Sequence, residues 1–193
     1  MISLPFRRSP PDSTIDALYG TIVAQARSPV FYRSYGVPDT VACRIEMIVL
    51  HLVLVLRQLR AGEVRPSANP LAQQLFDRFC EDMDDNFREM GMGDLAVPKE
   101  MRRVGEAFYG RAKAYESALG QGDGGALAAA LARNVFGAMQ NPGEPPLGAR
   151  WLAAYMQEAK AGLGAQATDA LVRAELEFPD PEAVVQPAPR ENR

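Results

Sequence analysis

Two consecutive segments with helical periodicity, separated by a short turn, most constrain the fold of this chain. Apolar residues recur at steps of three and four from Leu71 to Met90, and again from Val97 to Leu119. This spacing places each set on one face of an α-helix. The short connection around Gly91 leaves room only for an antiparallel arrangement of the two helices. The sequence therefore predicts an antiparallel helical hairpin at the centre of the fold.

Helical patterns also fill most of the remaining sequence, and no segment has the alternation of a strand. Beyond the hairpin, helices are predicted near residues 15–26, 40–59, 126–139, 146–160 and 168–176. The sequence therefore predicts an all-α, single-domain bundle of about seven helices around the hairpin. We expect a flexible N-terminus at residues 1–12, a helical domain at residues 13–176 and a disordered, proline-rich tail at residues 177–193.

The helix predicted from about Thr40 to Leu59 contains a long apolar stretch. From Met47 to Leu56 every residue is apolar except His51, the only histidine of the chain. The stretch is about half of the roughly 20 residues that a helix needs to cross a bilayer. A helix that is apolar nearly all round is typical of the centre of a soluble bundle. We therefore expect His51 to be a hydrogen-bonded core residue rather than a haem ligand.

Charged side chains are predicted to line the outer faces of the hairpin. Residues at equal distance from the turn should pair across it, which places Asp85 near Arg103 and Arg88 near Glu100. Within the first helix, Asp84 and Arg88 have the i,i+4 spacing of a favourable ion pair. Exposed bridges contribute about 0–1 kcal/mol each, so the simplest interpretation is a solvated face.

Two glycines lie inside the second hairpin helix. At interior positions Gly105 and Gly110 each cost about 0.5–1 kcal/mol relative to Ala. We therefore expect another helix, or a partner, to approach this helix closely at these positions.

Composition limits the classes of protein that the chain can belong to. Of its 193 residues 47% are hydrophobic and 23% charged, with a net charge of -3. These values are ordinary for a globular protein and argue against sequence-specific or general nucleic-acid binding. Cys43 and Cys80 lack metal-ligand spacing and are interpreted as reduced thiols. With no export signal or transmembrane segment visible, we expect a cytoplasmic protein, with peripheral contact at the inner face of the membrane as an option.

Several sequence blocks resemble the ubiquinol–cytochrome c chaperone family. The hairpin contains REMGMGDLAVPKEM followed by EAFYGRAKAY, and the upstream blocks are IVAQARSPVFYRSYGVPDT and MIVLHLVLVLRQL. Together the blocks cover roughly residues 15–136. One departure lies between the two glycines of the turn, where the family is expected to have a branched aliphatic residue and this chain has Met92.

The resemblance implies a non-catalytic, all-helical assembly factor for the cytochrome bc1 complex. Mitochondrial members of the family bind newly made cytochrome b, with a small partner protein, near the ribosomal exit tunnel. By resemblance, the expected partners are therefore nascent or unassembled cytochrome b, the ribosome surface and a small partner protein. The resemblance implies no catalytic residue, metal ion or cofactor.

Three groups of side chains are candidates for contacting a partner. A flexible Met in the turn suits an adaptable apolar surface. Cations along the second hairpin helix suit an acidic or anionic surface, although a solvated helix face is the simpler interpretation. Aromatic residues between two prolines suit a client, although such residues more often pin a loop to the core. The candidates are Met92; the cationic stripe Lys99, Arg102, Arg103, Arg111 and Lys113; and the aromatic cluster Phe31, Tyr32 and Tyr35.

Two alternative functions remain open. The first is a general ribosome- or membrane-associated adaptor with broader clients, which the sequence does not separate from a dedicated chaperone. The second is an all-α enzyme that acts on an isoprenoid diphosphate and uses Asp82, Asp84 and Asp85 to hold Mg²⁺. Such a site needs a second acidic cluster across a large cavity, and the sequence contains no candidate for one. The non-catalytic function is therefore preferred.

Overall fold

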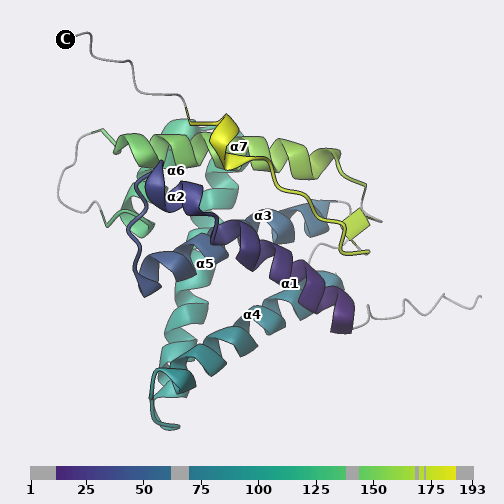
Figure 1. The fold of residues 1–193 in the computed structure, drawn as a ribbon, viewed down its shortest axis with the longest axis vertical. Coiled ribbons are helices and arrows are strands. Elements are labelled where there is room, and N and C mark those ends of the chain that lie inside the picture. The colour runs from purple at the N-terminus through teal and green to yellow at the C-terminus, as the bar shows by residue number, and fades with distance from the viewer. Residues whose placement is uncertain (1–11, 62–69, 138–143, 168–169, 172, 186–193) are drawn as a thin grey trace, which may run out of the picture.

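The computed structural model describes residues 12–61, 70–137, 144–167, 170–171 and 173–185. Within these residues the fold is all-α, which confirms the predicted bundle of about seven helices with its hairpin (Figure 1). The elements are α1 (Asp12–Ala26), α2 (Pro29–Arg33), α3 (Val41–Ala61), α4 (Pro70–Glu89), α5 (Val97–Gln121), α6 (Gly124–Asn134), α7 (Leu147–Ala165) and the short 3-10 helix η2 (Pro181–Ala183).

Helix α3 lies at the centre of the fold. It packs against α1, α4, α5 and α7, and every residue from Met47 to Leu56 is buried. The apolar stretch therefore forms the middle of the core, as its lack of a polar face predicts. Among the described residues, no helix is long and apolar enough to span a membrane.

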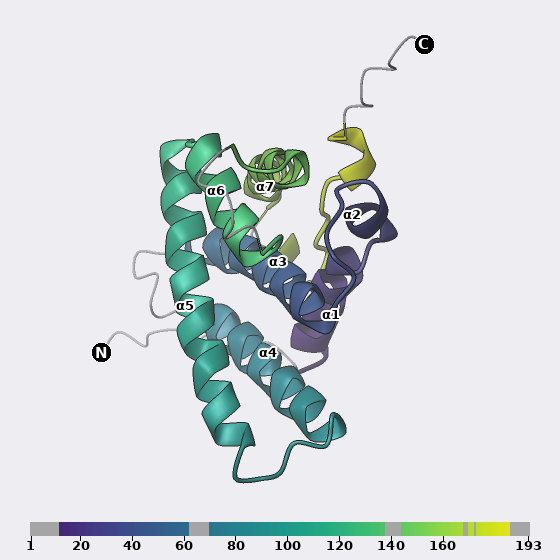
Figure 2. The ribbon, with the colours of Figure 1, turned by 90° about the vertical axis from the view of Figure 1, so that its left-hand side faces the viewer.

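The hairpin of α4 and α5 extends from the bundle to the lowest point of Figure 1. Gly91, at a φ of 82°, ends α4 in the left-handed conformation that glycine adopts readily. Helix α5 then runs back from the turn to α6, so it joins the projecting hairpin to the rest of the bundle (Figure 2). Any surface at the turn is therefore held on long helices anchored in the core.

The predicted ion pairs across the hairpin are wrong. Arg88 pairs instead with Asp84, at 2.5 Å between Nε and Oδ2, and with Asp94 in the turn. Arg103 pairs with Glu100 of its own helix. Only the predicted i,i+4 pair of Asp84 and Arg88 is confirmed. In Figure 2 the ends of α4 and α5 that flank the turn stand apart, so each arginine pairs with a carboxylate of its own helix or of the turn.

The predicted start of the disordered tail, at residue 177, needs correction. Residues 177–185, called the C-terminal strap below, are packed against the bundle rather than disordered. The Phe178 ring lies 5.1 Å from the ring of His51, and Pro181 is buried. The Tyr35 hydroxyl donates a hydrogen bond of 2.8 Å to the Pro181 carbonyl. The remainder of the predicted tail, residues 186–193, lies outside the described residues.

The last predicted helix is also shorter than expected. Of residues 168–176, positions 168, 169 and 172 lie outside the described residues. Ala174 has a φ of 59°, which interrupts helical geometry and turns the chain toward the strap. The predicted flexible N-terminus falls almost wholly on residues 1–11, which also lie outside the described residues.

Candidate functional site

Two of the three residues of the aromatic cluster, Phe31 and Tyr35, belong to the core. Phe31 is fully buried and Tyr35 is 2% exposed. The Phe31 ring lies 4.9 Å from the ring of Tyr155, which is buried on α7. Half-buried Tyr32 donates its hydroxyl hydrogen to the carbonyl of Ala26 at 3.0 Å. The expectation that Phe31 and Tyr35 contact a client is therefore corrected, because both are buried and hold α2 and the strap against the bundle. Contact of Tyr32 with a client stays a prediction.

The cationic stripe is largely neutralised within the chain. The Arg102 Nε lies 2.9 Å from a Glu106 carboxylate oxygen, and Arg103 pairs with Glu100. These exposed pairs leave little net charge on the first turns of α5. Lys99 and Lys113 are exposed and have no ion-pair partner in the part of the chain that the structure describes. Arg111 has a different environment, described below.

The hairpin turn exposes apolar side chains that sequence reasoning missed. Leu95 is 98% exposed and Met90 is 56% exposed, whereas the predicted candidate Met92 is half-buried. Periodicity predicts Met90 on the inward face of the first hairpin helix, but α4 ends one residue before it. Leu95 lies in the turn and belongs to neither helical repeat. An apolar residue between two amphipathic helices has no predicted core face to join, and this is the sequence signal for its exposure.

A groove between α3 and α5, lined mainly by apolar side chains, is a candidate for a partner-binding site. It encloses about 210 Å³, which is below the roughly 300–1,000 Å³ of typical small-ligand pockets. This size favours side chains of a protein partner over a whole small molecule. Its apolar lining comes from α3 and α5, namely Ile45, Val49, Val104, Ala107 and Phe108.

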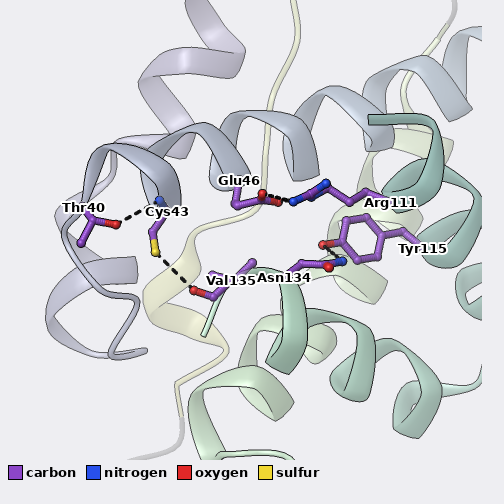
Figure 3. Close-up of polar contacts among 7 residues, drawn as sticks. All are labelled: Thr40, Cys43, Glu46, Arg111, Tyr115, Asn134 and Val135. Atoms are coloured by element: carbon purple, nitrogen blue, oxygen red, sulfur yellow. Dashed lines mark hydrogen bonds and ion pairs between the residues drawn. The ribbon is translucent and has the colours of Figure 1, made fainter. Parts of the chain in front are cut away.

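An ion pair between α3 and α5 lies among these apolar residues. Arg111 donates from Nε to Glu46 Oε2 at 2.5 Å and from Nη2 to Glu46 Oε1, a bidentate arrangement shown in Figure 3. The side chains of Arg111 and Glu46 are only 24% and 14% exposed. Burial raises the pKa of the Glu46 carboxyl above its ordinary value, although the hydrogen bonds and charge of Arg111 oppose this.

Polar contacts to α6 fix the surroundings of this pair. The Asn134 amide donates to the Tyr115 hydroxyl at 3.0 Å, which ties α6 to α5 (Figure 3). Burial raises the pKa of Tyr115 to about 12, so its hydroxyl stays neutral at physiological pH. The Cys43 thiol donates to the Val135 carbonyl at 3.3 Å and ties α3 to the end of α6. The groove is therefore formed by helices that are held together on more than one side.

The surface of α5 is open at its interior glycines. A methyl group added at Gly105 or Gly110 would meet no atom of a neighbouring side chain or segment within 4 Å. The expected close approach of another helix of this chain is therefore wrong for the described residues. Approach of a partner stays a prediction.

The acidic residues proposed for an isoprenoid enzyme have separate structural partners. Asp82 accepts a hydrogen bond of 2.8 Å from the Tyr19 hydroxyl, and Asp84 pairs with Arg88. Asp85 is exposed on α4. Across the described residues, no group of three or more His, Cys, Asp or Glu side chains is placed to hold a metal ion. The three carboxylates thus do not converge on one site.

Comparison with known proteins adds independent information. A profile of the family described as Ubiquinol-cytochrome C chaperone matches residues 33–178, which include the groove and the whole hairpin. A crystal structure described as the Cbp3 homolog from Brucella abortus has a similar fold, with a TM-score of 0.77 and 36% sequence identity. The similarity covers 89% of this chain and 91% of that one. A search of curated proteins found no match.

Proposed function

Because this chain belongs to the ubiquinol–cytochrome c chaperone family, we propose that it is an assembly chaperone of the cytochrome bc1 complex. We further propose that its client is newly made cytochrome b, held through an apolar segment before assembly. The observation that carries the proposal is the α3–α5 groove, whose lining is apolar and whose charged residues are paired with one another.

The chemistry of the groove matches that of a membrane segment in water. Such a segment exposes apolar side chains and brings no counter-charges, so unpaired charges in its binding site would be desolvated at a cost. In the groove, Glu46 is paired with Arg111 and Glu100 with Arg103. An apolar occupant therefore buries Ile45, Val49 and the α5 side chains without isolating a charge.

The hairpin turn extends the apolar surface beyond the groove. Leu95 and Met90 are exposed there, and the groove begins at Glu100 in the first turn of α5. Methionine is flexible and polarisable, which suits a surface that accepts different side chains in turn. We propose that the client contacts these turn side chains in addition to the groove.

A single polar substitution in the groove tests the proposal. Ala107 is half-buried on the α5 side, and Ala107→Gln would place an uncharged amide over the apolar lining. We expect cells carrying only this variant to lose most of their cytochrome b, measured from the reduced-minus-oxidised spectrum of their membranes. The matched control is Ala154→Gln on the exposed face of α7, which should leave cytochrome b unchanged.

The same strains separate a dedicated chaperone from a general adaptor. Proteins recovered with the wild-type chain should be enriched in cytochrome b and other bc1 subunits, and Ala107→Gln should reduce that recovery. A broad client set that is insensitive to Ala107→Gln would instead favour a ribosome- or membrane-associated adaptor. Normal cytochrome b in cells with a folded Ala107→Gln protein would exclude the groove as the client site.

A further inference from the structure

The Glu46–Arg111 pair has hydrogen-bonding capacity that the protein does not use. A guanidinium carries five N–H donors in a planar fork, and the bidentate contact with Glu46 uses one on Nε and one on Nη2. In the described part of the chain, the Arg111 Nη1 group donates to no acceptor. Three N–H groups of Arg111 therefore depend on water as long as the groove is open.

Covering the groove with a uniformly apolar helix would remove that water. The Arg111 side chain is already only 24% exposed, so an occupant that seals the groove would leave its remaining donors without partners. An unsatisfied buried donor on a charged group is costly. An occupant that carries an acceptor oxygen at this position avoids the penalty, whereas one with only apolar side chains does not.

The charge of the pair limits which acceptor fits. Glu46 and Arg111 neutralise each other, and the nearby Glu100 is neutralised by Arg103. A third full charge under the occupant would have no counter-charge in the groove, which makes its burial unfavourable. An uncharged acceptor, such as the side-chain amide of Asn or Gln, satisfies Arg111 without adding charge.

We propose that the Glu46–Arg111 pair is a recognition element that selects an apolar helix carrying one uncharged amide side chain. The amide oxygen accepts from Arg111 and thereby fixes the register of the helix along the groove. Single polar contacts within apolar interfaces are known to specify register in this way. The inference rests on the proposed function, because it assumes that an apolar helix occupies the groove.

Binding of synthetic helices to the purified full-length chain tests the proposal. The probes are apolar Leu/Ala helices with lysines at both ends for solubility, with a central Leu, Asn or Asp, and with a fluorophore for anisotropy. We expect the wild-type chain to bind the Asn peptide about 10- to 100-fold more tightly than the Leu peptide, as for one added hydrogen bond to a charged group. The Asp peptide should bind no better than the Leu peptide.

A double substitution removes the recognition element and leaves an apolar groove. In Glu46→Leu/Arg111→Leu we expect the preference for Asn to disappear, while affinity for the Leu peptide is kept or increased. The matched control is Arg60→Leu/Glu116→Leu, which removes another α3–α5 ion pair, with 3.4 Å between its atoms, that does not line the groove. The control should keep the preference for Asn.

An asparagine scan along the peptide tests register without any variant of the protein. We expect tighter binding at one position, and at positions one helical repeat away, but not elsewhere. Equal binding of the Asn and Leu peptides, a preference that survives the double substitution, or an effect that is the same at every position would overturn the proposal. Failure of the wild-type chain to bind any of the peptides would instead contradict the proposed function of the groove.

Discussion

His51 is a polar side chain in the middle of an apolar core, and its hydrogen bonds explain how it is tolerated. A carbonyl can only accept, so the ring Nδ1–H donates to Met47 at 2.7 Å. The neutral Nε2 then accepts from the Tyr155 hydroxyl at 3.0 Å, and that hydroxyl accepts from the Gln25 amide at 2.9 Å. Both ring nitrogens are satisfied, which confirms the expectation of a hydrogen-bonded core histidine.

This burial predicts a pH dependence of stability. Burial lowers the pKa of His51 to about 4, below its ordinary value of 6.5. The unfolded chain therefore binds a proton at His51 more readily than the folded chain does. Burying neutral His51 costs no stability through protonation above pH 6.5, and the folded state loses stability as the pH falls from 6.5 toward 4. The full effect is about 3 kcal/mol. Urea unfolding of the wild type and of His51→Gln at pH 7 and pH 4.5 should show a smaller loss in the variant; equal losses would contradict the assignment.

The close packing around Gly148 predicts that a larger residue there destabilises the protein. A methyl group there would lie 1.9 Å from the Tyr35 carbonyl oxygen and 2.9 Å from the Phe136 ring. Gly148→Ala should therefore force the backbone apart and lower the free energy of unfolding by about 1–3 kcal/mol. Gly162→Ala, on the same helix with nothing within 4 Å, is the control and should raise it by about 0.5–1 kcal/mol. Urea unfolding of both variants gives the comparison.

At the scale of the elements, helices α3 and α5 are joined by an ion pair that the sequence pattern of neither helix predicts. The bidentate pair of Glu46 and Arg111 spans the groove wall, and the pKa of Glu46 stays raised because burial outweighs the attraction of Arg111. Such a pair contributes little net stability compared with apolar residues of similar size, but removing one partner isolates the other. Arg111 is therefore a structural residue of the hairpin rather than a free cation of its surface.

A double-mutant cycle tests this role. Arg111→Leu alone leaves the Glu46 carboxylate 14% exposed and unpaired, and should cost about 1–3 kcal/mol. Glu46→Leu/Arg111→Leu should restore most of that loss, because it leaves no isolated charge. Urea unfolding at pH 7 measures all members of the cycle. Additive effects of the two single substitutions would show that the side chains do not interact.

At the scale of the whole molecule, the C-terminal strap closes the bundle over α1, α2 and α3. Gln25 donates to the Pro179 carbonyl at 3.2 Å, and Tyr35 donates to the Pro181 carbonyl. Phe178 packs on His51. The strap thus contacts segments that are far apart in sequence, and its removal would expose the polar network around His51 to water.

Truncation after Glu177 should therefore destabilise the protein. Loss of half-buried Phe178 and buried Pro181 should lower the free energy of unfolding by about 2–4 kcal/mol. For a chain of this size the melting temperature should fall by about 5–10 °C. Truncation after Val185 removes none of these contacts and is the control in the same calorimetric measurement. A shift of only a degree or two after Glu177 would show that the strap is not part of the stable core.

Periodicity predicted the helices, the hairpin and the core position of α3, because the spacing of apolar residues and the geometry of one helix are local properties. The same locality predicted the Asp84–Arg88 pair correctly. The prediction failed for Arg103, which was expected to pair with Asp85 across the hairpin and pairs instead with Glu100 of its own helix, because the distance between the two helices at the turn is not a local property. Of the predicted contact residues, Met92 lies near the exposed turn, whereas Phe31 is in the core.

The groove and the strap depend on how the helices cross, and no local pattern encodes a crossing. Glu46 and Arg111 are 65 residues apart, and Tyr35 and Pro181 are 146 apart, so each pair meets only after several helices have packed. A proline-rich segment has no apolar period, yet Pro181 is buried because the bundle offers it a site. Local sequence thus decides which residues are helical and apolar, while packing over long chain separations decides which charges are neutralised and which apolar side chains remain open to a partner.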